Sequence, residues 1–212
     1  FPTRRSSDLE TLAAAMILLS YWNKERTLFD PFCGSGTIPI EAAMIGRNIA
    51  PGLDRKFASE EWERIDKEYW KEARKKAFEA IDNDVKLDIM GCDIDKRSIL
   101  RSRDNATNLG LEEDIQFFMK DMRDVDLKDN YGVVVTNPPY GERIGEKEEI
   151  DLLYTDLGKI FKEFKTWSIY VITSEENFEK IYGKKADRKR KLYNGRIKVD
   201  YYQFYGPRPP KE

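Results

Sequence analysis

The sequence predicts a single α/β domain built on a doubly wound, mostly parallel sheet. Short apolar stretches typical of strands alternate with stretches of helical periodicity, a pattern that covers both faces of a parallel sheet with helices. Near the C-terminus, Asn194-Gly195 separates 190–193 from 196–199, which is a strong hairpin signal and predicts an antiparallel strand at one edge. The chain of 212 residues is long enough for one well-cored domain and an insertion.

The strands are indicated by short runs rich in apolar and β-branched residues. They are predicted at 27–30, 87–93, 115–119, 131–136 and 167–173. Between them, apolar residues at helical spacing predict helices at 9–20, 38–45, 96–109, 150–164 and 175–182. Pro39 falls in the first turn of the second helix, where its missing N–H costs little, and Gly110 is a terminator for the third.

Residues 47–84 are heavily charged and predict a helical insertion after the first strand–helix unit, with Ser59 as the N-cap. An apolar stripe recurs along it at helical spacing: Trp62, Ile65, Tyr69, Ala73 and Ala77, widened by Trp70, Phe78 and Ile81. Because a helix needs such a stripe to dock, we expect it to form core beside the sheet rather than a binding face.

Composition narrows the classes of function. The net charge is only -2, so any nucleic-acid-binding patch must be local. With no histidine, His-based catalysis and His-containing zinc sites are excluded, and no metal is expected. Two cysteines, no long apolar run and no signal-peptide pattern favour a cytoplasmic protein without a membrane segment. The polar, basic residues 1–8 lack an initiator Met and are interpreted as a tag, a junction or a fragment edge, so that the domain spans 9–212.

The stretch 133–140 is the strongest candidate for a functional site. Three valines predict a buried strand, and Pro138 and Pro139 end it abruptly because proline cannot donate to a ladder. An amide from Asn137 and a ring from Tyr140 are then presented at the carboxyl edge, where open parallel sheets bind ligands. Taken alone, however, the tetrapeptide is equally compatible with a purely structural role as a tight turn with an aromatic plug.

A second candidate is the turn 34–37 between the first strand and its helix. The backbone N–H groups of such a turn favour a carboxylate or phosphate, although a plain tight turn has the same sequence. Position 39 is proline, so the dinucleotide fingerprint is incomplete, and the nucleoside-triphosphate motif is absent. Asp30 before the turn would repel a pyrophosphate and suits a ligand with a cationic amine as well as a carboxylate.

Two further carboxylates follow the next strands. Asp93 can accept the hydroxyls of a ribose, and Asp121 stands where an acceptor for an adenine amine is expected, although either could simply face solvent. The interval from Gly36 to Asp93 exceeds the roughly 20 residues of a nicotinamide site, and the insertion accounts for the excess. Together with Asp30, these residues specify an adenosine that bears an amino acid, and S-adenosylmethionine has that set of groups.

With S-adenosylmethionine as the methyl donor, the tetrapeptide 137–140 is suited to bind the amine that accepts the methyl group. The lone pair of an amine conjugated to a ring is delocalised, and charge builds on the nitrogen as a methyl group arrives. The Asn137 oxygen and the Pro138 carbonyl can each accept one N–H and stabilise that charge, while Tyr140 stacks on the base. The base must be splayed or flipped to enter such a pocket.

At this point the chain resembles a known family. The segments 30–37 (DPFCGSGT), 40–43 (IEAA), 91–95 (GCDID) and 137–140 (NPPY) look like motifs of class I S-adenosylmethionine-dependent methyltransferases that modify exocyclic amines. The longer stretches DPFCGSGTIPIEAAMIGRNIAPG, TNPPYGER and KLYNGRIKVDYYQFYGP resemble the catalytic domain of the THUMP-associated rRNA guanine-N2 methyltransferases, and the likeness covers 9–207.

The resemblance implies a seven-stranded Rossmann-like sheet with an antiparallel last strand, S-adenosylmethionine as donor, and the guanine N2 amine of large-subunit rRNA as acceptor. The residues implied for the donor are Asp30, Phe32, Gly34, Gly36 and Thr37 for the methionine part, Asp93 and its neighbour Ile94 for the ribose, Asp121 for the adenine, and Asn137 beside the methyl group. Asn137, Pro138, Pro139 and Tyr140 are implied as the acceptor site. Family members carry a THUMP RNA-binding domain upstream, and no such domain is expected within residues 1–212.

The stretch 184–198 is densely basic, and phosphate contacts there compete with the interpretation as a solvated face. The candidate RNA-binding residues are Arg143, Lys189, Arg190, Lys191 and Arg196. Tyr201, Tyr202 and Tyr205 are expected to pack rather than to stack on bases.

The sequence therefore predicts an rRNA guanine-N2 methyltransferase domain. A tRNA guanine-N2 or a DNA adenine-N6 methyltransferase uses a similar acceptor tetrapeptide and stays open. A catalytically silent module that binds S-adenosylmethionine and RNA is the alternative from another class, although such a module would not require an intact 137–140.

Overall fold

A computed structural model describes residues 4–127, 130–140 and 146–210. Seven strands form one sheet: β1 (Leu28–Asp30), β2 (Ile89–Asp93), β3 (Ile115–Met119), β4 (Val133–Thr136), β5 (Ser168–Thr173), β6 (Arg188–Asn194) and β7 (Ile197–Phe204). Their order is β3-β2-β1-β4-β5-β7-β6. The neighbours from β3 to β5 are parallel, whereas β7 is antiparallel to both β5 and β6. The predicted sheet and its terminal hairpin are confirmed.

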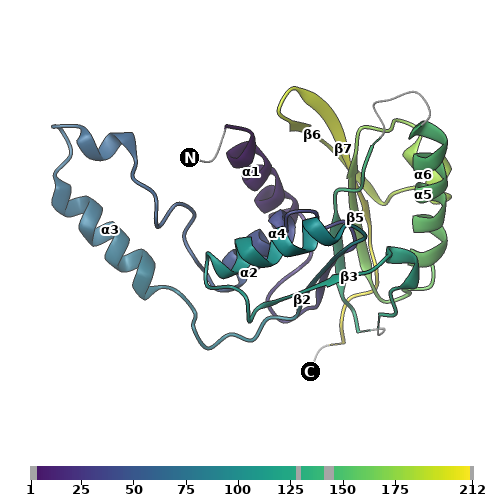
Figure 1. Ribbon diagram of the computed structural model, residues 1–212, viewed down its shortest axis with the longest axis horizontal. Coiled ribbons are helices and arrows are strands. Elements are labelled where there is room, and N and C mark those ends of the chain that lie inside the picture. Colours follow the sequence, from purple (N-terminus) through teal and green to yellow (C-terminus); the bar gives the residue numbers. More distant parts are fainter. Residues whose placement is uncertain (1–3, 128–129, 141–145, 211–212) are drawn as a thin grey trace.

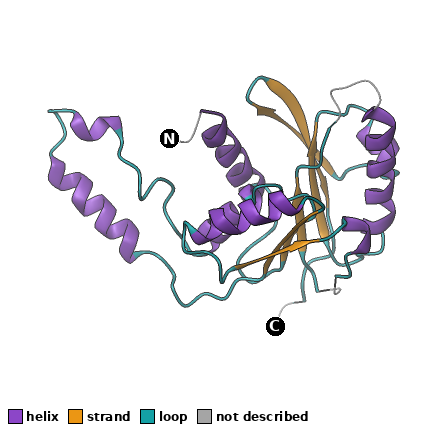
Figure 2. Ribbon diagram, in the orientation of Figure 1, coloured by secondary structure: helices purple, strands orange, loops and turns teal. Residues whose placement is uncertain are grey.

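Helices cover both faces of the sheet, which is viewed nearly edge-on in Figure 2. On one face lie α1 (Arg4–Leu18), α2 (Thr37–Gly46) and α4 (Lys96–Thr107), and on the other lie α5 (Glu146–Phe161) and α6 (Phe178–Tyr182). Val133 and Val135 belong to the first core and Val134 to the second, as the alternation of a strand requires. The apolar run of β4 is thus explained by burial on both sides.

Several boundaries differ from the prediction by a few residues, as is usual at element ends. The largest difference at the N-terminus is α1, which begins at Arg4 rather than at residue 9. Residues 4–8 contain no proline or glycine and begin with two arginines, which favour helix, so the change of composition at residue 9 did not mark a helix start.

The insertion is organised differently from the prediction. Its main helix is α3 (Lys67–Glu79), preceded by the short η1 (Ala58–Glu61), and the N-cap is Asp66, whose carboxylate accepts from Glu68 N at 2.9 Å. Ser59 is therefore not the cap of this helix. The insertion is held together by Arg74, whose guanidinium donates to the carbonyls of Leu53 and Arg55.

The prediction that the aromatic stripe forms core beside the sheet is wrong. Trp62, Tyr69 and Phe78 are 62%, 69% and 68% exposed, and α3 stands away from the sheet in Figure 1. Within the described ranges, Trp70 is the one residue of the stripe with an aromatic partner, and it stacks on Phe57 at 5.7 Å between ring centroids. Helical periodicity predicts that an apolar face exists but does not say what covers it.

A short helix after β3, η2 (Met122–Asp124), completes the elements. Within the described part of the chain, no helix is sufficiently long and apolar to span a membrane.

Candidate active site

The predicted site residues gather at the carboxyl edge of the sheet. Asp30, Asp93 and Thr136 are the last residues of β1, β2 and β4, and Asp121 follows β3. Between β1 and β4 the strand order changes direction, because β2 and β3 lie on one side of β1 and β4 lies on the other. Ligands of open α/β sheets bind at such a switch point.

Asp30 is a buried carboxylate at this switch point, only 1% exposed. Its Oδ1 accepts from Thr136 Oγ1 at 2.7 Å and from Phe32 N at 3.1 Å, and its Oδ2 has no hydrogen-bond partner among the described residues. Burial raises the pKa of Asp30 to about 7, although both hydrogen bonds act to lower it. A cation reaching Oδ2 would restore the charged form of this carboxylate.

The turn 34–37 is held from within the protein. Gly34 and Gly36 have φ values of +53° and +83°, which favour glycine. Gly34 N donates to Asp93 Oδ2 at 3.0 Å and Gly36 N donates to Cys33 O at 2.7 Å, so the expectation of bare N–H groups is wrong for both. The Asn105 side chain donates to Ser35 O at 2.9 Å.

Gly36 also has a packing role. A Cβ atom there would lie 2.9 Å from Phe117 Cζ and 2.9 Å from Ser102 Cβ, whereas one at Gly34 would meet nothing within 4 Å. The helix α2 starts directly after this turn, at Thr37, whose hydroxyl lies 3.2 Å from that of Ser35. The second glycine therefore lets the turn approach α4 and β3 closely.

Asp93 ties the first two strand ends together. Besides the bond from Gly34, its Oδ1 accepts from Asp95 N at 2.8 Å. Each oxygen of a carboxylate can accept a second hydrogen bond, so the two ribose hydroxyls proposed for Asp93 remain compatible with this arrangement. Ile94, the next residue, is 71% exposed.

Asp121 is the N-cap of η2 and accepts from Arg123 N at 2.9 Å and Arg123 Nε at 3.0 Å. Burial acts to raise the pKa of Asp121, but these hydrogen bonds and the Arg123 charge outweigh it, and the pKa is lowered. The preceding residue, Lys120, donates its N–H to Asp93 O at 3.1 Å. The third carboxylate is thus brought to the same edge as the other two.

The segment 137–140 leaves β4 at this edge. Asn137 Oδ1 is buried and has no hydrogen-bond partner among the described residues. Pro139 O accepts from the Tyr154 hydroxyl at 3.0 Å, and the same hydroxyl lies 2.8 Å from Thr173 Oγ1. A buried acceptor without a donor costs about 1–3 kcal/mol of folding free energy. The unpaired Asn137 oxygen therefore needs an explanation, because the hydrogen bond from Tyr154 to Pro139 O holds the segment in place.

Tyr140 closes the segment and is also held. Its hydroxyl accepts from Asn194 Nδ2 at 2.9 Å, which joins the acceptor segment to the turn between β6 and β7. The sequence predicts Asn194 only as a residue of the hairpin turn. The two contacts from Tyr154 and Asn194 lack any local signal in the sequence, because they join residues far apart along the chain.

The candidate RNA-binding residues do not form one surface. Lys189 lies against Asp200, with 3.4 Å between Nζ and Oδ2, and Arg190 Nε is buried without a partner in the part of the chain that the structure describes. Lys191 is exposed, as is Arg196 in the following turn. Consecutive residues of β6 point to opposite faces, so Arg190 is separated from Lys189 and Lys191. Arg143 lies outside the described residues.

The tyrosines of β7 behave as expected. Tyr201 and Tyr202 are fully buried. Tyr205, the residue after β7, is half-buried, with its ring 5.2 Å from that of Tyr21.

Cys33 and Cys92 are buried free thiols, and no cluster of three His, Cys, Asp or Glu side chains that could hold a metal occurs within the described ranges.

Comparison with known proteins identifies methyltransferases as relatives of this chain. Residues 6–203 match the RMKL-like methyltransferase domain family, UPF0020. The chain is 49% identical over 202 residues to YpsC of Bacillus subtilis (strain 168), provisionally named an RNA methyltransferase, covering 95% of this chain and 52% of that protein. It is 40% identical over 198 residues to the ribosomal RNA large subunit methyltransferase K/L of Shewanella baltica (strain OS155), covering 91% of this chain and 28% of that protein.

A solved structure extends the likeness to the fold. The crystal structure of SMU.472, provisionally named a methyltransferase and complexed with SAH, superimposes with a TM-score of 0.91 at 47% identity, covering 95% of this chain and 53% of that chain. The present chain thus spans about half or less of the length of the relatives it matches. The mixed seven-stranded sheet is that of the class I methyltransferases, and the chain belongs to the RMKL-like methyltransferase domain family.

Proposed function

We propose that this domain transfers a methyl group from S-adenosylmethionine to the exocyclic N2 amine of a guanine in large-subunit rRNA. The observation that carries the proposal is the buried, unpartnered Asn137 Oδ1 at the carboxyl end of β4. An acceptor that the protein itself leaves unsatisfied is suited to an N–H group of a substrate. Its position beside the buried Asp30–Thr136 pair supports a donor and an acceptor meeting at one switch point.

The residues at the switch point fit S-adenosylmethionine. Asp30, with its free Oδ2, would hold the cationic amine, Asp93 the ribose hydroxyls and Asp121 the adenine amine. The remaining residues proposed to surround it are Phe32, Gly34, Gly36, Thr37 and Ile94. Bound there, S-adenosylmethionine supplies an electrophilic methyl group on a sulfonium.

The protein's own part is to position the amine and to stabilise the charge that develops on it. Asn137 Oδ1 and Pro138 O each accept one N–H, which directs the lone pair toward the methyl group. Tyr140 supports the base with its ring while Asn194 holds its hydroxyl. Tyr154 fixes Pro139 O and so prevents this stretch from relaxing away from the base.

The choice of rRNA as substrate is supported by relatives, whereas the choice of the guanine amine rests on the resemblance of the sequence motifs alone. The Shewanella relative is named for the large-subunit ribosomal RNA, and YpsC is named for RNA. An upstream THUMP domain in the whole protein stays a prediction. An RNA target and the free thiols of Cys33 and Cys92 support a cytoplasmic setting.

The test is the identity of the modified nucleoside. The domain is incubated with methyl-labelled S-adenosylmethionine and, in parallel, with large-subunit rRNA, tRNA and duplex DNA, and the products are digested to nucleosides. We expect labelled N2-methylguanosine from rRNA. Labelled N6-methyladenine as the sole product would exclude the guanine amine, and donor binding without any product would indicate a catalytically silent module.

A further inference from the structure

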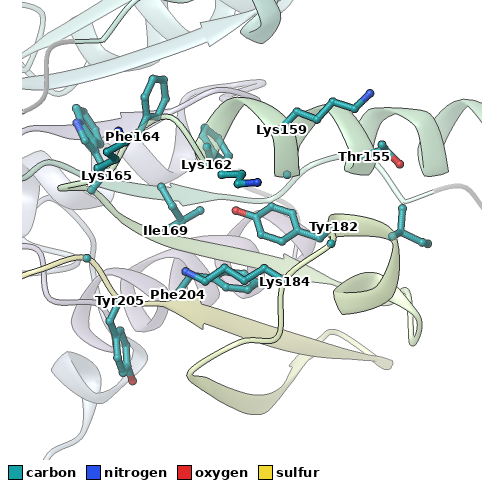
Figure 3. Close-up of a pocket in the computed structure, with 16 residues that line it drawn as sticks. Thr155, Lys159, Lys162, Phe164, Lys165, Ile169, Tyr182, Lys184, Phe204 and Tyr205 are labelled. Carbon is teal, nitrogen blue, oxygen red and sulfur yellow. The ribbon is translucent and has the colours of Figure 1, made fainter.

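A second pocket lies at the opposite edge of the sheet from the acceptor segment. Its volume is about 540 Å³, and it is bounded by the end of α5, the start of β5, α6 and the end of β7 (Figure 3). Its lining includes Trp167, which precedes β5, whereas Thr173 at the other end of β5 lies beside the acceptor segment through Tyr154. A pocket of this size can enclose a nucleotide-sized ligand.

The interior of this pocket is aromatic. Phe164, Trp167, Tyr182 and Phe204 contribute rings to the lining. The Tyr182 and Phe204 rings stack on one another, with 4.6 Å between centroids. The Tyr182 ring also stacks on Phe178, with 5.2 Å between centroids. Phe164 is the least buried of the four rings and is the most open to the face of a planar base.

The rim carries only positive charge. Four lysines belong to the lining, Lys159, Lys162, Lys165 and Lys184, and no aspartate or glutamate does. Lys159 lies 3.4 Å from Asp156 and is also suited to the carboxyl end of α5, so its presence is explained without a ligand.

The other lysines are not explained in that way. Lys162, Lys165 and Lys184 are exposed and have no carboxylate partner among the described residues. Lys184 comes from the segment after α6, on the far side of the pocket from α5, and its Nζ lies 5.6 Å from the Phe204 ring centroid. Cations from two separate elements thus converge on one aromatic cavity.

Tyr182 supplies the polar group inside. The residue is only 7% exposed, and its hydroxyl has no hydrogen-bond partner among the described residues. In Figure 3 this hydroxyl points into the cavity toward Lys162. Burial raises the pKa of Tyr182, so the hydroxyl remains a proton donor at neutral pH. This oxygen is not one of the buried polar atoms that lack a partner, so it is open to the pocket and can donate to a ligand there.

We propose that this pocket binds a nucleotide, with its phosphate at the lysines and the Tyr182 hydroxyl and its base on the aromatic wall. The source that fits the rest of the molecule is an RNA strand whose target base reaches Asn137 at the other edge. That choice of source rests on the proposed function, whereas the nucleotide chemistry of the pocket does not. A free mononucleotide is the other source of the same groups.

The test compares two charge reversals in the whole chain. Lys162→Glu with Lys184→Glu alters the pocket, and Lys67→Glu with Lys86→Glu makes the same charge change at exposed lysines outside it. Binding of a single-stranded RNA oligonucleotide and of guanosine monophosphate is measured by fluorescence anisotropy and calorimetry at several salt concentrations. Binding of S-adenosylmethionine reports the integrity of each variant.

We expect the pocket variant, Lys162→Glu with Lys184→Glu, to weaken nucleotide binding about tenfold or more and to reduce the salt dependence of RNA binding. The control variant, Lys67→Glu with Lys86→Glu, should change the affinity and its salt dependence less. Tyr182→Phe, which keeps the ring, should weaken binding about fivefold. Weakened RNA binding, with or without weakened guanosine monophosphate binding, supports the pocket with RNA as the source, whereas weakened guanosine monophosphate binding alone supports the pocket with a free mononucleotide as the source. Unchanged binding of both probes, or equal weakening by the control variant, overturns the proposal.

The outcome is separable from that of the proposed function. If the protein forms no methylated nucleoside but the pocket variant weakens nucleotide binding, the pocket stands and the methyl transfer does not. If methylated nucleoside forms and the pocket variant binds both probes as the wild type does, the methyl transfer is supported and the nucleotide pocket is excluded.

Discussion

The Asn194 side-chain amide donates to the Tyr140 hydroxyl at 2.9 Å, across a separation of 54 residues in sequence. It connects the turn of the β6–β7 hairpin at the sheet edge to the segment that leaves β4. The terminal hairpin therefore does more than extend the sheet, because it holds the ring proposed to support the target base.

Removing this hydrogen bond should impair methyl transfer without affecting the donor. Asn194→Ala and Tyr140→Phe each delete one partner, and each should lower kcat/KM for RNA about fivefold, the worth of one ordinary hydrogen bond. Because both act on the same bond, the double variant should be little worse than either single one. Additive losses in steady-state kinetics would show that the bond does not carry the effect.

The raised pKa of Asp30, about 7, makes donor binding dependent on pH. Only the charged carboxylate attracts a cationic amine, so affinity for S-adenosylmethionine should be constant above pH 7 and should fall about tenfold per unit below it. Titration calorimetry across pH 5–8 measures this. Asp30→Asn should bind weakly at every pH, and a variant that keeps the wild-type profile would exclude Asp30 as the titrating group.

The same carboxylate affects stability in the opposite sense. Its folded pKa lies above the unfolded value of 3.8, so its contribution is fully favourable below pH 3.8 and is lost as pH rises through about 7. Glu41, whose pKa burial also raises to about 7, adds to this window. The difference in urea unfolding between wild type and Asp30→Asn isolates the contribution of Asp30.

The two glycines of the turn 34–37 should respond differently to alanine. Gly34→Ala meets open space and costs only the left-handed backbone, about 1 kcal/mol of unfolding free energy. Gly36→Ala adds a collision with Phe117 and Ser102 and should cost about 3 kcal/mol. Urea denaturation measures both, and equal losses would contradict the packing role of Gly36.

The exposed aromatic face of α3 should contribute little to the stability of the domain. Tyr69→Ser and Phe78→Ser should each change the unfolding free energy by less than about 0.5 kcal/mol, because both side chains are largely exposed. Phe178, which is fully buried, is the matched control, and Phe178→Ala should cost about 3–5 kcal/mol. A large loss at Tyr69 or Phe78 would mean that α3 packs as core after all.

The sequence predicted an apolar face on the helix of the insertion but could not predict whether that face is buried. The sheet and the positions of Asp30, Asp93, Asp121 and Asn137 at one edge follow from local patterns, because each residue ends a strand or follows one within two residues and parallel strands end together. The covering of an apolar helix face depends on distant parts of the chain, and the stripe of α3 was therefore misjudged.

The supporting contacts were missed for a related reason. Tyr154 lies within the helix predicted at 150–164, and its ring is fully buried, as the apolar face of such a helix requires. Its hydroxyl nevertheless reaches Pro139 O and Thr173, and nothing in the helical period distinguishes it from a purely apolar neighbour. Such contacts depend on the packing of α5 against the end of β4.

The buried oxygen of Asn137 is the feature on which the proposed chemistry depends most. The most direct measurement is the single-turnover rate of methyl transfer to RNA for Asn137→Ala, with saturating S-adenosylmethionine and with donor and RNA binding measured in the same samples. Asn137→Asp, which keeps an acceptor oxygen, is the companion variant. We predict that the alanine variant binds both ligands and transfers at least about 100-fold more slowly, as for the loss of one group that stabilises developing charge, and that the aspartate variant retains part of the rate. An alanine variant that transfers at the wild-type rate would contradict the account.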